Sequence, residues 1–458
     1  MVITDLVTLT QAQRSYFLTD ETKPVERRME MLNILKSGIL KREKDIYAAL
    51  KADLNKSEFE SYMTEVGMVL DELRFITKHL RGWARPRRVP TPLAQFHSRS
   101  FQIPEPYGVV LIMSPWNYPF QLSLEPLIGA IAAGNCAIVK PSAYAPRTSQ
   151  VIAELIADCF SPEYVSVVQG GRQENQDLLK QRFDYIFFTG SVAVGKQVME
   201  SASRFLTPVS LELGGKSPCI VDPTADLKIA ARRVAFGKFL NAGQTCVAPD
   251  YLLIQQTVKD EFLHDLIDEI KGFYGDSPLD NDSYPKIINE KHFTRLKNLM
   301  EGESVVTGGR TNDKGQIAPT ILDGVTAQSP VMREEIFGPV LPVLVYDDIT
   351  EAIDFIRQRE KPLALYLFTK DRKTQNRVLG SLSFGGGCVN DTIIHLATSH
   401  MGFGGVGNSG MGSYHGKASF DTFSHYKSIV KKSYWIDLPF RYPPHTAFKA
   451  RLIRMFLH

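Results

Sequence analysis

Short, almost entirely apolar segments alternate with amphipathic segments from Tyr107 onward, and this alternation constrains the fold more than any other feature. Val109-Val-Leu-Ile-Met113 and Cys136-Ala-Ile-Val139 are two such segments, and a predicted helix over residues 122–133 separates them and ends at Gly134. Strands that are apolar along their whole length are typical of a parallel sheet covered on both faces. The sequence therefore predicts an α/β fold built on parallel sheets.

The alternation continues in the second half of the chain without repeating the sequence of the first half. Strands are predicted over residues 251–254, 340–346 and 363–368, and a helix over 349–359. We expect two α/β domains that join near Glu212-Leu-Gly-Gly-Lys-Ser-Pro218, where the paired glycines permit a hinge. Upstream, residues 25–85 read as helices, and residues 96–103 alternate loosely, as in a strand or an arm.

Composition narrows the class of protein. The net charge is only +3 in 458 residues, and no basic stripe carries interleaved aromatic residues, so we expect no nucleic-acid partner. The five cysteines are odd in number and widely separated, without the spacing of a metal site. We therefore expect no metal and a reducing, cytoplasmic location. The N-terminus lacks the pattern of a secretory signal, and no apolar stretch is long enough for a transmembrane helix.

Polar segments follow several of the predicted strands, where parallel sheets bind their ligands. Asn117 lies in a loop after the first strand, and Lys140 directly follows the next. Phe187-Phe-Thr-Gly-Ser-Val-Ala-Val-Gly195 runs from a strand into a helix, which favours a dinucleotide because helix N-terminal amides bind phosphate. A plain strand-to-helix turn, a turn-forming asparagine and a solvated lysine are the open alternatives.

Two residues suit covalent catalysis. Glu212 is the only charge in Val209-Ser-Leu-Glu-Leu213, and burial there would raise its pKa toward that of a general base. A structural ion pair is the alternative. Cys246 follows a small, turn-prone Gly-Gln-Thr sequence that can present a thiol at the mouth of a cleft, although most cysteines are inert core residues. Neither residue decides the function alone.

Three further segments allow more than one interpretation. Glu334-Glu335 places adjacent acids before a tight turn, and one of them can face a ligand while the other is solvated. The glycine-dense residues 401–412 must form an irregular loop, either a flexible lid or a connector. The basic, amphipathic residues 448–458 either dock on the protein or a partner subunit, which we favour, or touch a membrane surface.

Together these segments resemble the aldehyde dehydrogenase superfamily, and in particular its class 3 branch. The matching motifs come in the family's order and are Pro115-Trp-Asn-Tyr-Pro119, Val139-Lys-Pro-Ser142, Phe188-Thr-Gly-Ser191, Glu212-Leu-Gly-Gly-Lys-Ser-Pro218, Gly243-Gln-Thr-Cys246, Glu334-Glu-Ile-Phe-Gly-Pro339 and Phe403-Gly-Gly-Val-Gly-Asn-Ser-Gly-Met-Gly-Ser-Tyr-His-Gly-Lys417. The resemblance implies a Rossmann-like NAD(P)-binding domain of residues 1–84 and 104–211 and a catalytic domain of residues 212–408. It also implies an oligomerisation arm and tail of residues 85–103 and 418–458.

The resemblance further implies NAD(P)-dependent oxidation of aldehydes to carboxylic acids. The Cys246 thiolate attacks the aldehyde carbon, and Asn117 and the Cys246 backbone amide hold the oxyanion of the resulting thiohemiacetal. After hydride transfer, water activated by Glu212 hydrolyses the thioester. The implied cofactor contacts are Lys140, Ser142, Gly190, Ser191, Gly195, Glu335 and Phe337, and the implied substrate contacts are Tyr118, Leu122 and Phe403.

Two positions depart from the family pattern. Ala143 stands where the family commonly has a glutamate that binds the adenosine ribose, so we expect NADP to be accepted alongside NAD. Gly402 stands where class 3 members usually have proline, which leaves the chain-length preference open. The class 3 resemblance implies medium-chain aliphatic or aromatic aldehydes and a homodimer.

Two other activities compete with hydrolytic aldehyde oxidation. Transfer of the acyl group to coenzyme A is the rival within the superfamily, but the presence of Glu212 favours water as the acceptor. A cofactor-independent thiol esterase belongs to another class, and it would not need Lys140 or Glu335.

Overall fold

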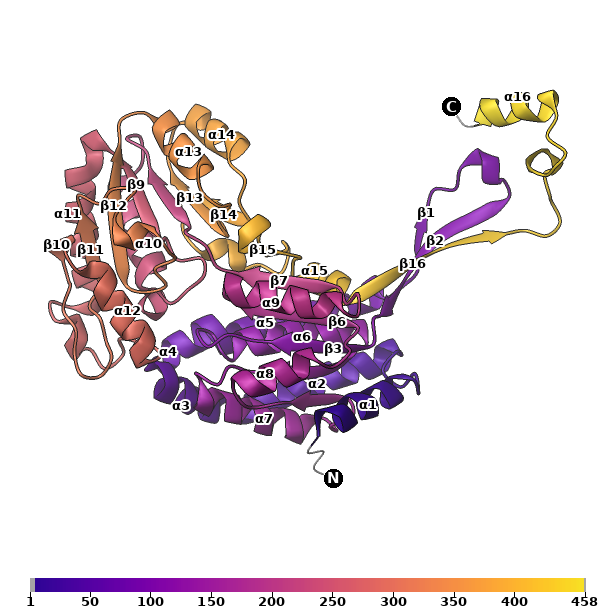
Figure 1. The fold of residues 1–458 in the computed structure, drawn as a ribbon, viewed down its shortest axis with the longest axis horizontal. Helices are drawn as coiled ribbons and strands as arrows, with labels where there is room; N and C mark the ends of the chain where they lie inside the picture. The colour runs from indigo at the N-terminus through magenta and orange to yellow at the C-terminus, as the bar shows by residue number, and fades with distance from the viewer. Residues whose placement is uncertain (1–4, 457–458) are drawn as a thin grey trace.

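The structure is a computed structural model that describes residues 5–456. Residues 1–4 and 457–458, which the predicted cofactor domain and tail include, lie outside the described residues. In the described part of the chain, the strands form three sheets (Figure 1). Two of them make up the body of the molecule, and the third projects from the body as an arm.

The first sheet has the strand order β15-β7-β6-β3-β4-β5. In chain order its strands are β3 (Val109–Met113), β4 (Cys136–Lys140), β5 (Val165–Val167), β6 (Tyr185–Gly190), β7 (Val209–Leu213) and β15 (Gly410–Met411). All neighbours pair in parallel except β15, which pairs antiparallel with β7. The glycine-dense segment is therefore not irregular throughout, because residues 410–411 close the edge of this sheet.

The strand order of the first sheet reverses between β3 and β6. The chain runs outward from β3 to β4 and β5 and then returns to β6 on the other side of β3. Parallel sheets bind ligands beyond the carboxyl ends of their strands at such a reversal. The loop with Asn117 follows β3 and Ser191 follows β6, so both lie at this edge.

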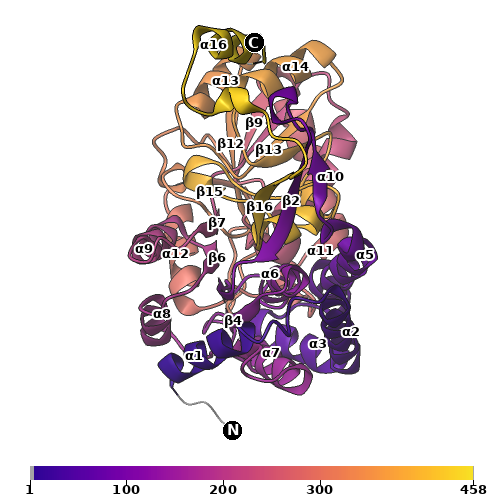
Figure 2. The ribbon, with the colours of Figure 1, turned by 90° about the vertical axis from the view of Figure 1, so that its right-hand side faces the viewer.

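Helices cover both faces of the first sheet (Figure 2). On one face lie α1 (Leu6–Phe17), α8 (Arg172–Leu179) and α9 (Val192–Ser203). On the other face lie α2 (Val25–Lys41), α5 (Gly67–Trp83) and α6 (Gln121–Ala133), with α3 (Glu43–Leu54) and α7 (Pro146–Cys159) nearby. Strands β3 and β4 are buried along their whole length, as predicted for a doubly covered sheet. Gly134 ends α6 with a φ of 97°, a conformation that favours glycine.

The second sheet has the order β10-β11-β12-β9-β8-β13-β14. Its strands are β8 (Pro218–Val221), β9 (Tyr251–Gln255), β10 (Ser304–Thr307), β11 (Thr320–Asp323), β12 (Val340–Tyr346), β13 (Ala364–Phe368) and β14 (Gly386–Val389). Neighbours pair in parallel except β10 with β11. The helices around it are α10 (Leu227–Phe239), α11 (Lys259–Tyr274), α12 (Glu290–Met300), α13 (Ile349–Arg357) and α14 (Arg372–Ser381). The predicted α/β fold with parallel sheets is confirmed.

The arm is an antiparallel sheet of β1 (Arg87–Val89), β2 (Ser98–Pro106) and β16 (Ser424–Lys432). Strand β16 pairs with β2 over its whole length. Helix α15 (Gly416–Thr422), which directly precedes β16, packs on α5 and α6. Helix α16 (Ala447–Phe456) lies at the far end of the arm (Figure 1). Within residues 5–456, no helix is both long enough and apolar enough to cross a membrane.

Candidate active site

Cys246 lies in a tight turn between α10 and β9. The turn contains three consecutive residues in left-handed conformations: Asn241 at φ 51°, Ala242 at φ 50° and Gly243 at φ 71°. A side chain at Gly243 would meet the carbonyl oxygen of Gly338 at 2.2 Å, so only glycine fits this turn. The backbone therefore presents Cys246 in a defined position.

The Cys246 thiol is held in its protonated form before any ligand binds. Its pKa is raised to about 12, first by burial and then by the nearby carboxyl groups of Glu335 and Glu212, while the backbone amides of Cys246 and Val247 oppose the rise. A thiolate is the reactive form of cysteine. The site must therefore remove a proton before Cys246 can act as a nucleophile.

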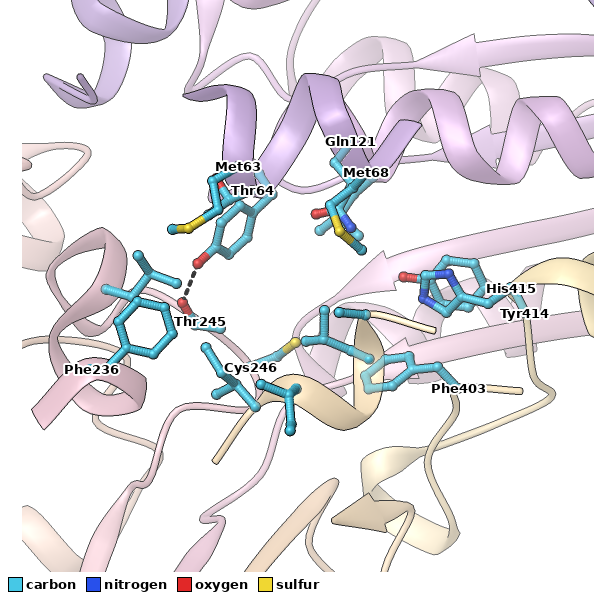
Figure 3. Close-up of a pocket in the computed structure, with 17 residues that line it drawn as sticks. Met63, Thr64, Met68, Gln121, Phe236, Thr245, Cys246, Phe403, Tyr414 and His415 are labelled. Carbon is cyan, nitrogen blue, oxygen red and sulfur yellow. Dashed lines mark hydrogen bonds between the residues drawn. The ribbon is translucent and has the colours of Figure 1, made fainter. Parts of the chain in front are cut away.

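The loop that carries Asn117 is hydrogen-bonded to the turn that carries Cys246. Asn117 is 2% exposed, and its Nδ2 donates to the carbonyl oxygen of Gln244 at 3.0 Å. The neighbouring side chains also meet, because the Tyr118 hydroxyl and the Thr245 hydroxyl are hydrogen-bonded at 2.7 Å (Figure 3). The structure thus brings a side-chain amide donor beside the turn of the thiol, from residues more than a hundred positions away.

Glu212 is the next-to-last residue of β7 and is 3% exposed. Neither of its carboxylate oxygens has a hydrogen-bond partner among the described residues. Burial raises the pKa of Glu212 well above its ordinary value. The carboxyl group lies next to Gly404, where an added side chain would come within 3.2 Å of Oε1. An ion pair does not account for this residue, and its carboxyl group is free to exchange a proton with a ligand or water.

An apolar cavity of about 230 Å³ opens beside Cys246 (Figure 3). The structure places the predicted substrate residues Tyr118, Leu122 and Phe403 on its wall. Sequence reasoning missed other lining residues, among them Met63, Met68, Phe236, Leu240, Ile393 and His415. Phe236 and Leu240 have helical spacing just upstream of Cys246, which is a usable signal, whereas Met63 and Met68 have none.

The predicted adenosine and phosphate residues lie at or just after the carboxyl ends of β4 and β6. Lys140 is 3% exposed, its Nζ donates to the carbonyl oxygen of Pro141 at 2.7 Å, and burial lowers its pKa to about 8. Ser142 accepts a hydrogen bond from the backbone N–H of Tyr144 at 3.2 Å. Ala143 is exposed beside it. The Lys140 ammonium group therefore keeps hydrogen-bond donors that can bind an incoming anion.

Helix α9 begins directly after Gly190 and Ser191. The Ser191 side chain makes no capping hydrogen bond, so the first amides of the helix remain available. The buried hydroxyl of Thr189 has no hydrogen-bond partner among the described residues. Gly195 lies against Leu213, where an added side chain would come within 2.7 Å, so α9 packs close to β7. These unsatisfied donors fit the phosphates of a dinucleotide.

Glu335 lies close enough to Cys246 to raise the pKa of its thiol, and Phe337 follows two residues later. The Glu335 carboxyl packs against Gly214, and burial, together with Asp250, raises its pKa to about 8. Phe337 has a strained φ of 51°, and its ring meets that of Trp116 edge to face at 5.3 Å. Sequence reasoning missed His292, whose ring lies 5.2 Å from that of Trp116 and whose buried Nδ1 has no partner among the described residues.

Comparison with known proteins supports the assignment that the geometry suggests. Residues 6–429 match the aldehyde dehydrogenase family. The 4,4'-diaponeurosporen-aldehyde dehydrogenase of Staphylococcus aureus is 49% identical over 446 residues, which cover 97% of each chain. The dimeric NADP-preferring aldehyde dehydrogenase of Canis lupus familiaris is 46% identical over 446 residues, which cover 96% of this chain and 98% of the relative.

A solved structure agrees over the whole length. The substrate-bound Staphylococcus aureus AldH superposes with a TM-score of 0.98 at 47% identity, and each chain is covered completely. The predicted resemblance to class 3 enzymes and the predicted use of NAD or NADP are confirmed. The chain belongs to the aldehyde dehydrogenase family and is an oxidoreductase that oxidises aldehydes with NAD or NADP.

Proposed function

We propose that Cys246 is the nucleophile of this enzyme, that Asn117 is its oxyanion donor and that Glu212 is its general base. One observation carries the proposal: Cys246 lines an apolar cavity, the Asn117 amide is hydrogen-bonded to its turn, and the unpaired buried carboxyl group of Glu212 is close enough to raise the pKa of the Cys246 thiol. The three come from a turn, a loop and a strand. A packing role explains neither the unpaired Glu212 nor the strained turn before Cys246.

The first steps form and oxidise a covalent adduct. Cys246 gives its proton to water, and its sulfur attacks the aldehyde carbon, which forms a C–S bond and breaks the C=O π bond to give a thiohemiacetal oxyanion. Asn117 Nδ2 and the Cys246 backbone amide donate to that oxyanion. When bound, NAD(P)⁺ supplies the acceptor for the hydride. Loss of the hydride from the thiohemiacetal carbon restores the C=O bond and leaves a thioester on Cys246.

Hydrolysis then completes the reaction. Ionised Glu212 accepts a proton from water, and the hydroxide attacks the thioester carbon. The C–S bond breaks, Cys246 leaves as a thiolate and the carboxylic acid is released. The apolar surroundings that raise the pKa of Glu212 also make its ionised form a stronger base than an exposed glutamate. This hydrolytic step favours water over coenzyme A as the acyl acceptor.

We assign the cofactor to the edge of the first sheet. Lys140 and Ser142 bind the adenosine half, and Gly190, Ser191 and Gly195 lie along the pyrophosphate at the start of α9. Glu335 binds the nicotinamide ribose, with Phe337 packed beside it. The unpartnered Thr189 hydroxyl and the uncapped α9 support this path.

Dual use of NAD and NADP follows from the pairing of Lys140 with Ala143. Without a carboxylate at residue 143, nothing there repels a 2′-phosphate, and Lys140 attracts it. We expect Ala143→Glu to lower kcat/KM for NADP by roughly tenfold, about 1.4 kcal/mol, with little change for NAD. In the unchanged enzyme, a preference for NAD above roughly a hundredfold, about 2.7 kcal/mol, would overturn this idea.

The cavity supports apolar aldehydes, medium-chain aliphatic or aromatic, as substrates. Tyr118, Leu122 and Phe403 line it, and further apolar side chains complete the wall. Burial of a hydrocarbon chain there gains roughly 0.8 kcal/mol for each CH₂ group. We expect kcat/KM to rise with chain length in a series of linear aldehydes until the cavity is full. A charged short aldehyde as the best substrate would contradict this.

Domain division, assembly and location complete the proposal. We divide the chain as the resemblance implies, with residues 212–408 as the catalytic domain. We propose a homodimer through the arm and tail, because Tyr434, Trp435 and Phe448 there are exposed and one relative is named dimeric. The described cysteines are free, which suits the proposed cytoplasmic location. Light scattering after size-exclusion chromatography would check the dimer.

The nucleophile is tested by Cys246→Ala. This change should abolish both the burst and the steady production of NAD(P)H while the variant still binds cofactor with unchanged affinity. Retained turnover would overturn the assignment of Cys246. The enzyme could also hydrolyse esters without cofactor. That activity would not interfere with this test, because the test measures only NAD(P)H.

A further inference from the structure

A buried ion pair lies directly beneath the loop that carries Asn117. Lys56 and Glu65 are both 0% exposed, and Lys56 Nζ donates to Glu65 Oε1 at 2.6 Å. Lys56 lies between α3 and the short α4 (Glu58–Ser61), and Glu65 lies in the π-helix η1 (Tyr62–Val66). Apolar side chains of similar volume often stabilise a core as well as a buried ion pair does. Stability alone therefore does not account for the pair, and the reaction steps above use neither side chain.

The ammonium group of Lys56 holds the backbone of the Asn117 loop. Its Nζ donates a second hydrogen bond to the carbonyl oxygen of Asn117 at 3.1 Å. The same Nζ lies 4.0 Å from the centre of the Tyr118 ring, a favourable cation–π contact. Lys56 thus fixes two consecutive residues of this loop, one by its main chain and one by its side chain.

The carboxylate of Glu65 holds the other end of the same loop. Its Oε2 accepts hydrogen bonds from the backbone amides of Phe120 at 2.8 Å and Gln121 at 3.2 Å. These amides begin α6, where a negative charge is favourable. The ion pair therefore clamps the loop from Asn117 to Gln121 between an ammonium donor and a carboxylate acceptor.

The clamp continues into the turn of the proposed nucleophile. The Asn117 carbonyl oxygen also accepts from Asn241 Nδ2 at 2.8 Å, and Asn241 Nδ2 lies 3.2 Å from the Gln244 carbonyl oxygen. That Gln244 oxygen is the acceptor for Asn117 Nδ2. Lys56 therefore supports the point at which the Asn117 loop and the Cys246 turn are joined. The π-helix that carries Glu65 is of a kind found frequently at functional sites.

We propose that Lys56 and Glu65 are positioning residues that fix the Asn117 side-chain amide against the Cys246 turn before the aldehyde binds. This inference rests on the oxyanion role proposed for Asn117. A donor that is already in place stabilises developing charge without rearranging during the reaction. Misplacement of such a group by about 1 Å can cost ~10²-fold in rate.

A double-mutant cycle on the pre-steady-state burst of NAD(P)H tests the proposal, because the burst reports the steps up to the thioester. We expect Lys56→Met to slow the burst by about 10- to 100-fold in the otherwise unchanged enzyme. In the Asn117→Ala background the same change should cost less than about threefold, since the donor that Lys56 positions is already absent. Equal losses in both backgrounds would overturn the proposal. As a matched control, Lys51→Met on the exposed face of α3 should leave the burst unchanged.

Removal of Lys56 alone leaves Glu65 buried without its partner, so the cycle is also run with Lys56→Met/Glu65→Gln. This variant carries neither charge and keeps an oxygen for the amides of Phe120 and Gln121. We expect it to melt near the temperature of the unchanged enzyme and still to show the slow burst. A burst of unchanged rate in this folded variant would overturn the positioning role alone, whereas turnover by Cys246→Ala would overturn the proposed function.

Discussion

Glu65 and Glu212 are two glutamates buried in the same molecule with opposite surroundings. Glu65 is fully buried and accepts hydrogen bonds from the Lys56 ammonium and from two backbone amides. Glu212 is 3% exposed, and neither of its oxygens has a partner among the described residues. A carboxylate with a complete set of donors holds structure, whereas one without donors can take up and release a proton.

Two buried lysines repeat this contrast. Lys56 Nζ binds a carboxylate, a carbonyl oxygen and an aromatic face. Lys140 Nζ donates to the adjacent Pro141 carbonyl oxygen, and burial lowers the pKa of Lys140 to about 8. The comparison teaches that the partners of a buried charge, and not its burial, separate a structural group from one that awaits a ligand.

The largest expected effect is on turnover at the unpaired glutamate. Glu212→Gln removes the proposed base without changing its size, so steady-state kcat should fall by about 10²–10⁴-fold. The first burst of NAD(P)H should remain, because the steps up to the thioester do not need the water-activating base. Stopped-flow absorbance at the nicotinamide band measures both phases. Unchanged steady-state turnover would remove Glu212 from the mechanism.

The matched substitution at the paired glutamate should have a large effect on stability. Glu65→Gln leaves the Lys56 charge buried without a countercharge and should lower the free energy of unfolding by about 3 kcal/mol. Glu212→Gln breaks no hydrogen bond among the described residues and should lower it by less than about 1 kcal/mol. Chemical denaturation of the two variants measures both values. Equal losses would break the comparison between the two residues.

The pH dependence of turnover sharpens the comparison further. Glu212 must be ionised to accept a proton, and its folded-state pKa is raised, so kcat should increase with pH until the pH passes that pKa. Below it the increase is up to about tenfold for each pH unit. The same shift means that stability is lost as pH rises from the unfolded to the folded pKa, since the folded state holds the proton more tightly. Glu212→Gln should abolish both dependences.

The smallest effect is expected at Lys140. In the proposed role its ammonium form binds the 2′-phosphate, and a lowered pKa of about 8 means that this form is lost as pH rises through 8. At one pH unit above the pKa about a tenth of the lysine remains charged, so KM for NADP should rise severalfold. KM for NAD should change much less. Lys140→Met should remove the difference between the two cofactors, and a pH-independent KM for NADP would contradict the role of this lysine.

Much of the fold followed from local patterns. Apolar runs such as Val109–Met113 predicted the strands of a covered parallel sheet, and Gly134 predicted the end of α6. Asn117, Lys140 and Ser191 were placed at the ligand-binding edge because each follows a predicted strand. The edge strand β15 was not predicted, since its pairing with β7 joins residues about two hundred positions apart.

Local sequence patterns did not predict all of the residues that line the cavity. Met63 comes from the π-helix η1 and Met68 from the start of α5, and neither segment has a motif that points to a substrate. Only the packing of α5 and η1 against α6 brings them to Cys246. Likewise, nothing near His292 in the sequence indicates that its ring lies against Trp116.

The sequence by itself determined which residues can carry the chemistry: a thiol in a constrained turn, a lone carboxylate in an apolar strand and an amide after a strand. It also determined the parallel α/β fold, because a strand buried on both faces appears in the sequence as a run of consecutive apolar residues. Only the tertiary structure decided which buried charges are paired. Glu65 meets its amide donors 55 and 56 residues away, and β7 and its neighbours offer none to Glu212. Hydrogen bonds depend on distances in space, and those distances arise only when the chain has packed.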